Sequence, residues 1–242
     1  MLKSVLILSV ILFVATQGYT QDDREHYSTE FIWGINKNTS GGLIGGFVFR
    51  KSRVVNERLY ESIGLELMNV KHPLEVQFRT GSGSAFIFGK MNYLYALRFQ
   101  YGRELILFRK APQQGVEIKA IGAVGPSLGL LAPYYIEYSP GGGQGGNTRR
   151  EPYNPANSSH VPENILGPGY IFQGVQESKI RLGANLKAGL SFELGSAKSS
   201  VTGFEIGALL DAYTQRIQLM AGAENRALFP TAYVTIFYGT RR

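Results

Sequence analysis

The sequence feature that most constrains the fold is an alternation of apolar and polar side chains from Ser178 to Leu194. A helix would spread this pattern around its whole circumference, so the period of two predicts a strand with one apolar and one polar face. At about 3.3 Å per residue the segment would extend roughly 50 Å, which is long for a strand of a soluble protein. A tilted strand of that length crosses the ~30 Å of hydrocarbon in a bilayer. We therefore predict a transmembrane strand of a β-barrel.

Seven further segments show strand patterns, so the predicted fold is all-β, an eight-stranded antiparallel up-and-down transmembrane β-barrel. An even number suits a bacterial barrel made from one chain. Pro126 lacks an N–H group and is expected to weaken the upper end of its strand. Residues 105–108 either lengthen a strand or raise the count to ten. The predicted strands are 29–36, 43–50, 59–69, 92–102, 116–130, 178–194, 201–213 and 228–239.

The front of the chain predicts export. Lys3 precedes an apolar run from Val5 to Ala15 that is too short to span a membrane as a helix, so residues 1–20 are predicted to be a cleaved Sec signal peptide. Residues 21–28 form a polar leader, and 29–242 form the barrel. The longer links fall mostly on one side, and residues 139–177, which are rich in Gly and Pro, are predicted to be one long extracellular loop or a partly ordered cap. The predicted location is the outer membrane of a bacterial cell.

Alternation alone does not say which face points inward, and a soluble eight-stranded barrel such as a lipocalin is the main structural alternative. The polar face carries charges of both signs, which can neutralise one another in a narrow interior that leaves no room for a water channel. The apolar face ends in aromatic residues, as two interfacial girdles require. The predicted lumen charge network is Glu66, Arg98, Lys119, Arg181, Lys187, Glu205 and Asp211. The predicted lipid-facing and girdle residues are Trp33, Tyr93, Tyr95, Phe99, Tyr101, Leu186, Leu190, Phe192 and Phe204.

Residues 72–138 carry a resemblance to a known family. The segments 88–104 (FGKMNYLYALRFQYGRE) and 115–135 (GVEIKAIGAVGPSLGLLAPYY), with His72-Pro73, resemble a family of small uncharacterised outer-membrane β-barrels from Bacteroidota. The resemblance implies no established activity and no catalytic residues. Because these bacteria build large envelope machines around such barrels, it implies an accessory subunit of an envelope complex.

Catalytic chemistry is weakly represented. The net charge of +7 is spread along the chain without a dense Lys/Arg run, which argues against nucleic-acid binding. The chain has no Cys and three dispersed His, so we expect no metal and no cofactor. Ser158, Ser159, His160 and Glu163 are the only cluster that resembles a hydrolase triad, and ordinary loop polarity is the favoured interpretation.

These observations favour a non-enzymatic barrel that acts through partners. Its expected partners are outer-membrane lipid, lipopolysaccharide and other envelope proteins of a complex for protein assembly, secretion or uptake. Arg149, Arg150 and Tyr153 in the long loop are the predicted partner contacts. The alternatives are an enzyme that acts on lipid or peptide at the barrel rim, and a narrow channel.

Overall fold

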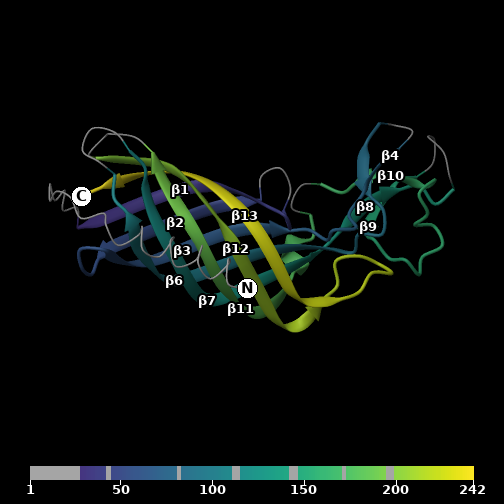
Figure 1. Cartoon of the computed structure of the whole chain (residues 1–242). Coiled ribbons are helices and arrows are strands. Elements are labelled where there is room, and N and C mark those ends of the chain that lie inside the picture. Colours follow the sequence, from purple (N-terminus) through teal and green to yellow (C-terminus); the bar gives the residue numbers. More distant parts are fainter. Residues whose placement is uncertain are drawn as a thin grey trace, which may run out of the picture.

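Eight long antiparallel strands close into a barrel in this computed structural model (Figure 1). The structure describes residues 28–41, 45–80, 83–110, 115–141, 147–170, 173–194 and 199–242, so the predicted signal peptide and the leader up to residue 27 lie outside the described residues. Each barrel strand pairs with its neighbours in sequence, and the first strand pairs with the last, from Glu30 opposite Arg241 to Asn38 opposite Tyr233. The barrel strands are β1 (Thr29–Asn38), β2 (Gly46–Val54), β3 (Leu59–Val70), β6 (Asn92–Phe108), β7 (Glu117–Pro133), β11 (Lys179–Leu194), β12 (Ser200–Ile217) and β13 (Arg226–Arg241).

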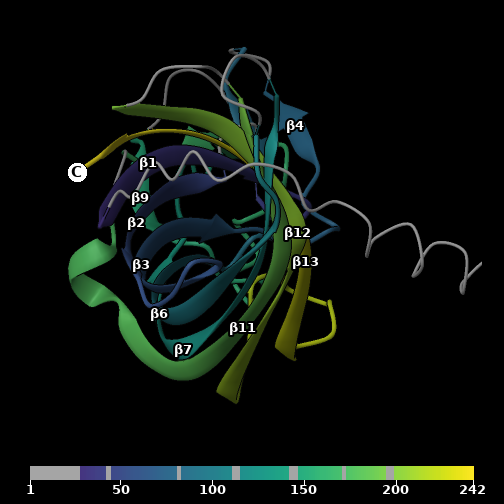
Figure 2. The same cartoon turned by 60° about the vertical axis from the view of Figure 1, so that its left-hand side comes forward.

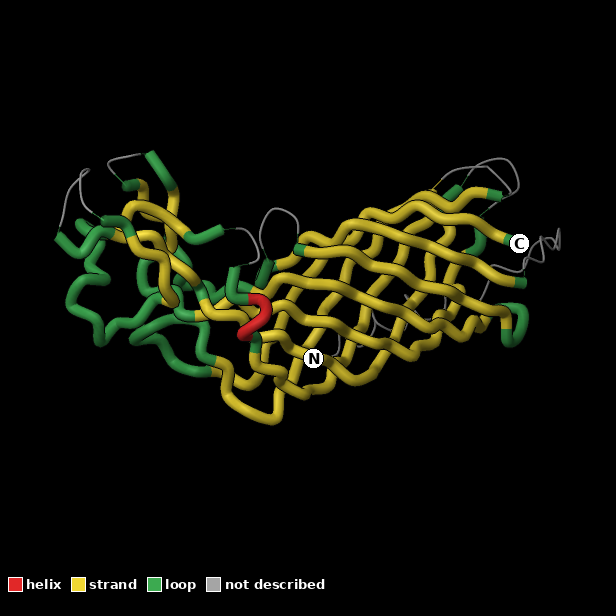
Figure 3. The backbone as a smooth tube through the Cα atoms, turned by 180° about the vertical axis from the view of Figure 1, so that it is seen from behind, coloured by secondary structure: helices red, strands yellow, loops and turns green. Residues whose placement is uncertain are grey.

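The predicted fold class is confirmed, because the barrel is closed, antiparallel and eight-stranded in up-and-down order. Residues 105–108 continue β6, which extends to Phe108, and they add no strand to the barrel. The tilt of the strands around the barrel is visible in Figures 2 and 3. Among the described residues, no helix has the length and apolar character needed to cross a membrane.

The two faces of the barrel wall differ in chemistry. Along β11, Asn185, Lys187 and Glu193 are buried inside, whereas Leu182 and Leu186 are exposed on the outer surface. The other long strands alternate in the same sense over the middle of the barrel, where polar side chains point inward and apolar ones face outward. A lipocalin-like barrel would have its apolar face inside. An apolar outer face around a polar interior is the arrangement of a transmembrane barrel.

The expectation for Pro126 is wrong, because β7 continues past it to Pro133. The pairing of β7 with β6 skips Phe99 and Gln100, which lie opposite Pro126 and Gly125. Asn185 of β11 covers this gap, since its side-chain amide lies 3.0 Å from the carbonyl oxygen of Gly125 and 3.1 Å from that of Pro126. Gln100 in turn donates a hydrogen bond to Asn185 Oδ1 at 3.0 Å. A strand tolerates a proline where side chains replace the missing ladder bonds.

One end of the barrel carries a small folded structure that we call the cap, made of the described residues within 71–91 and 134–178. It holds a three-stranded sheet in the order β10-β8-β9 and a β4–β5 hairpin. The segment 139–177 is thus not one featureless loop. In Figure 1 the cap lies at the end opposite the C-terminus. The cap elements are β4 (Gln77–Arg79), β5 (Ala85–Ile87), β8 (Tyr135–Tyr138), β9 (Arg149–Pro152), β10 (Ile165–Pro168) and the 3₁₀ helix η1 (Val175–Glu177).

Candidate functional site

A continuous chain of alternating charges crosses the middle of the lumen. Arg98 of β6 contacts Asp211 of β12 at 2.5 Å and Glu66 of β3 at 3.2 Å. Lys187 of β11 lies 2.6 Å from Glu66 and 2.9 Å from Glu205 of β12. Because each of these five side chains is buried, every charge in the chain is compensated by an opposite charge rather than by water.

The row of paired charges continues toward the end of the barrel opposite the cap. Arg50 of β2 joins Glu205 at 2.7 Å to Glu104 of β6 at 3.0 Å. Two neutral hydroxyls bind carboxylate oxygens that the cations also contact: Tyr233 donates to Glu205 Oε1 at 2.6 Å, and Ser52 donates to Glu104 Oε1 at 2.7 Å. The interior of the barrel is therefore a hydrogen-bonded ionic core.

A second ionic cluster lies near the ends of β1 and β13. Glu30 contacts Arg241 at 2.8 Å and Lys119 at 3.3 Å. Arg241 also contacts Glu193, and Lys119 contacts Glu117 at 3.5 Å. These residues come from β1, β7, β11 and β13, so the cluster ties the seam between the first and last strands to the opposite wall.

The cap end of the lumen is filled by apolar side chains. Val48, Met68 and Leu94 point inward from β2, β3 and β6, and they form one buried cluster with Leu219 and Phe229. A narrow barrel of eight strands has an interior that side chains can fill. With the ionic core below and the apolar cluster above, the lumen is that of a plugged barrel rather than an open pore.

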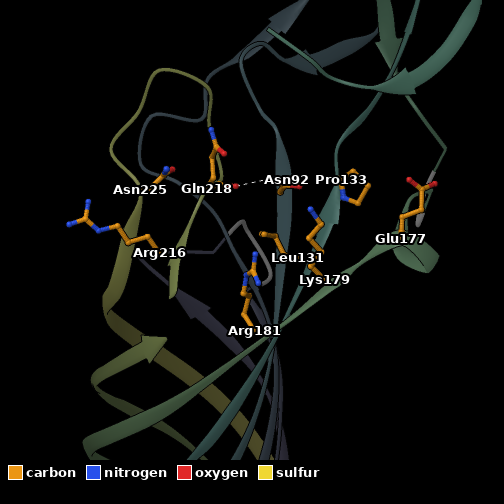
Figure 4. A pocket seen from close by; sticks show the side chains of 9 residues that line it. All are labelled: Asn92, Leu131, Pro133, Glu177, Lys179, Arg181, Arg216, Gln218 and Asn225. Atoms are coloured by element: carbon orange, nitrogen blue, oxygen red, sulfur yellow. Dashed lines mark hydrogen bonds between the residues drawn. The ribbon is translucent and has the colours of Figure 1, made fainter. Parts of the chain in front are cut away.

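Six of the seven predicted lumen charges meet in these two clusters: Glu66, Arg98, Lys119, Lys187, Glu205 and Asp211. The seventh, Arg181, does not fit the prediction. It lies on β11 between Lys179 and Gly183, and it lines a pocket at the cap end with Lys179 and Arg216 (Figure 4). Arg50 and Glu104 belong to the network although sequence reasoning missed them. Their positions on the polar face of β2 and β6 were the signal that could have identified them.

The outer wall carries the predicted lipid-facing residues. Trp33 is 49% exposed and its ring lies edge-on to Tyr238. Phe99, Tyr101, Leu186 and Leu190 are also exposed. Phe192 and Phe204 are partly buried and stack on each other across β11 and β12, with ring centroids 4.9 Å apart.

Tyr93 and Tyr95 lie at the cap end of the wall. Their rings stack with centroids 5.8 Å apart, and Tyr93 also packs edge-on against Tyr134 at the base of the cap. Toward the other end, the Tyr101 hydroxyl donates a hydrogen bond of 2.6 Å to Glu61. The aromatic residues therefore occur near both ends of the apolar wall, where girdles at two interfaces would lie.

The cap has its own core. Phe86, Tyr134, Ile136, Tyr138, Tyr153 and Ile165 form one buried cluster. Tyr153 packs against Phe88 and His160, so the structure places this predicted partner contact inside the cap rather than on its surface. The prediction failed because burial of an aromatic residue in a Gly- and Pro-rich segment leaves no periodic pattern.

Arg149 and Arg150 lie on β9, an edge strand of the cap sheet. Arg150 is held by Glu137 at 2.7 Å, and its guanidinium lies 4.0 Å from the centre of the Tyr170 ring. Arg149 is exposed. Of the three predicted partner contacts, Arg149 is therefore the one whose side chain reaches solvent without such a clamp.

His160 is a structural residue of the cap. Its Nδ1 accepts a hydrogen bond of 3.0 Å from the backbone N–H of Asn154, and its Nε2 lies 2.8 Å from Glu151. Tyr138 also donates to Glu151 at 2.7 Å, and this hydroxyl, followed by His160, lowers the pKa of the Glu151 carboxyl below its ordinary value. Since both ring nitrogens are used in this way, His160 is not positioned as a base for Ser158 or Ser159. Within the described ranges, no group of three or more acidic, His or Cys residues is arranged to hold a metal ion.

A buried ion pair lies within the link 71–91 at the base of the cap. Lys90 is fully buried, lies 2.7 Å from Glu75 and sits over the Tyr93 ring at 4.4 Å. Burial lowers the pKa of the Lys90 ammonium, and the Glu75 carboxylate opposes that shift. The backbone of Lys90 also pairs with that of Met220, and this bridge connects the link 71–91 to the link between β12 and β13.

Comparison with known proteins finds likeness in structure only. No protein-family model matches the chain, and no curated protein matches it in sequence. Among solved structures, the chain is similar to Ail, the attachment invasion locus protein of Yersinia pestis, solved alone and with the heparin analogue sucrose octasulfate. In the complex with the analogue, Ail shows 9% identity over 90% of this chain and 100% of Ail, with a TM-score of 0.37. Neisserial surface protein A matches with 10% identity over 89% of this chain and 97% of its own, with a TM-score of 0.38. Because both TM-scores are below 0.5, the fold is assigned from the strand pairing of the barrel and not from these similarities.

Proposed function

We propose that this chain is a non-enzymatic β-barrel of the bacterial outer membrane that serves as an accessory or structural subunit of an envelope complex. The apolar outer wall supports the membrane location, since exposed residues such as Trp33, Phe99 and Ile236 would be costly in water. The orientation that fits an outer-membrane barrel puts the short links in the periplasm and the cap outside the cell. The resemblance to barrels of Bacteroidota supports a place among envelope complexes of that phylum.

The observation that carries the partner role is a cap with a packed core above a plugged lumen. Over the residues that the structure describes, side chains fill the lumen, and both ring nitrogens of His160 are engaged by Asn154 and Glu151. The cap does expose apolar side chains beyond the lipid-facing wall: Leu74 and Val76 are 62% and 59% exposed. Apolar side chains that neither lipid nor the cap core covers are typical of a protein contact.

The experiment is recovery of partners from intact outer membranes. Full-length chain carrying an affinity tag is crosslinked in cells, extracted in mild detergent and analysed by mass spectrometry. The proposal predicts a defined set of envelope proteins that is lost in a Leu74→Asp, Val76→Asp variant. Val161→Asp is the matched control, because Val161 is an exposed apolar residue elsewhere in the same cap. A barrel that remains monomeric and recovers no partner would refute the subunit role.

The same preparation tests the alternative that the barrel is a narrow channel. Opposite charges paired across the lumen predict no measurable single-channel conductance after reconstitution in a planar bilayer. Steady conductance through the wild-type barrel would instead support a channel.

A further inference from the structure

The barrel wall opens between β11 and β12 at the cap end. Pairing of these strands ends at Gly183 opposite Tyr213. β11 continues to Lys179 along β7, whereas β12 loses its pairing with β13 after Ala212 and regains it at Ile217 opposite Arg226. The two strand ends therefore separate, and we call the space between them the notch.

The notch contains a pocket of about 380 Å³ lined by cationic and polar side chains. Lys179 and Arg181 approach from β11, and Arg216 and Gln218 from the end of β12. Figure 4 shows Lys179 and Arg181 rising side by side toward the centre, with Arg216 directed away at the edge. The far wall is fixed, because the Asn92 side chain donates a hydrogen bond of 2.8 Å to the Gln218 carbonyl.

The pocket has more positive than negative charge. Three of its lining residues are cations and one, Glu177, is an acid. The Glu177 carboxylate accepts a hydrogen bond from the Tyr135 hydroxyl, so it is engaged away from the cations. Among the described groups, Arg181 Nε and the neighbouring Ser178 Oγ are buried and have no hydrogen-bond partner. Buried donors without an acceptor are costly, and an oxyanion bound in the pocket would satisfy Arg181 Nε, since Arg181 lines it.

The notch also borders the lipid-facing wall. Ile180 and Leu182, which alternate with the two cations on β11, are 64% and 58% exposed on the outer surface. In the membrane orientation proposed above, this places the cations at the level of the outer headgroups. Lys and Arg are the side chains best suited to bind phosphate or sulfate oxygens.

We propose that the notch binds a tetrahedral oxyanion, a phosphate or sulfate group, carried either by a lipid headgroup or by a free solute. Arg181 Nε and the Lys179 ammonium are the principal donors, and Arg216 adds positive charge at the entrance. The pocket itself rests on the described geometry, and only the headgroup source rests on the proposed membrane location.

The first test is calorimetric titration of the full chain, folded in zwitterionic detergent, with inorganic pyrophosphate. A Lys179→Gln, Arg181→Gln variant should weaken binding by about 30-fold or more, since charge-assisted hydrogen bonds to both donors are lost. A Lys51→Gln, Arg53→Gln variant is the matched control, because it removes two exposed cations from the opposite end of the barrel. Arg181→Lys, which keeps the charge, should weaken binding less than Arg181→Gln.

The second test separates the two sources. The chain is placed in phosphatidylcholine nanodiscs with or without a diphosphorylated glucosamine lipid, and pyrophosphate is titrated again. Weaker pyrophosphate binding by the wild type in discs that contain the glycolipid assigns the site to a headgroup, and unchanged pyrophosphate binding assigns it to a free solute. Absence of pyrophosphate binding to the wild type, or equal binding by the double variant and the wild type, overturns the proposal without touching the partner role.

Discussion

Replacing Arg98 by Met tests whether the ionic core holds the barrel together. Arg98 Nε lies 3.0 Å and 3.1 Å from the two carboxylate oxygens of Asp211, and a second nitrogen lies 2.5 Å from one of them. Without Arg98, Glu66 still keeps Lys187 at 2.6 Å, but Asp211 keeps only the Ser127 hydroxyl at 3.2 Å. Because Asp211 is fully buried, Arg98→Met should lower the free energy of unfolding by about 3–5 kcal/mol.

A second substitution, at Asp211, distinguishes the cost of a buried carboxylate without a counter-charge from the cost of the packing lost with Arg98. An Arg98→Met, Asp211→Asn variant removes both charges and should be more stable than Arg98→Met alone, about 1–2 kcal/mol below the wild type. Arg103→Met is the control, since Arg103 lies on the outer face of the same strand and is exposed. Its effect should stay within about 0.5 kcal/mol.

The assay is equilibrium unfolding by urea in lipid vesicles, followed by tryptophan fluorescence. Trp33 is the single tryptophan of the chain and is exposed on the outer wall, so its emission reports transfer from lipid to water. A loss of less than about 1 kcal/mol for Arg98→Met, or additive losses in the double variant, would contradict the view that the lumen charges depend on one another.

Three further predictions concern close packing, lipid contact and pH. Gly125→Ala should strongly destabilise the barrel, because a Cβ at this position would lie 2.0 Å from a backbone oxygen of β6. Gly122→Ala on the same strand is the control, since its Cβ meets no atom within 4 Å, and it should change the free energy of unfolding by less than about 0.5 kcal/mol. Equal effects of the two substitutions in urea unfolding would count against the packing argument. Trp33 fluorescence should be quenched by lipids brominated on their acyl chains, and quenching only by soluble iodide would place the wall in water. The lowered pKa of Glu151, caused first by the Tyr138 hydroxyl, means that its carboxylate stabilises the cap above the unfolded pKa of 4.5 and loses that effect as the pH falls through the lower folded value. The protection of cap amides, measured relative to the intrinsic exchange rate at each pH, should thus fall in acid, and a Glu151→Gln variant that shows the same acid response would refute this cause.

The barrel could be predicted from the sequence because each wall strand faces two different solvents. Lipid on one side and a polar lumen on the other impose a period of two over many residues, as in Ser178 to Leu194. The same alternation predicted an inward position for the six charged residues that meet in the two ionic clusters. It failed for Arg181, because alternation continues along β11 past the point where β12 leaves it, and a single strand does not record where its neighbour ends.

The cap could not be predicted in the same way. Its strands β8, β9 and β10 have four residues each, which is too short for a periodic pattern to stand out. Their pairing depends on contacts between distant segments, such as Tyr153 with Phe88. Continuation of β7 through Pro126 was unpredictable for a related reason, since the compensating amide of Asn185 comes from another strand.

The seam between β1 and β13 has a consequence for biogenesis. It joins the two segments of the wall that are farthest apart in sequence, so the sheet keeps two bare edges until the last strand arrives. A chain interrupted before β13 would retain a full complement of lipid-seeking side chains without a way to close. In the proposed outer-membrane location, the polypeptide would need shielding during its passage, and the barrel can close only after the final strand has arrived.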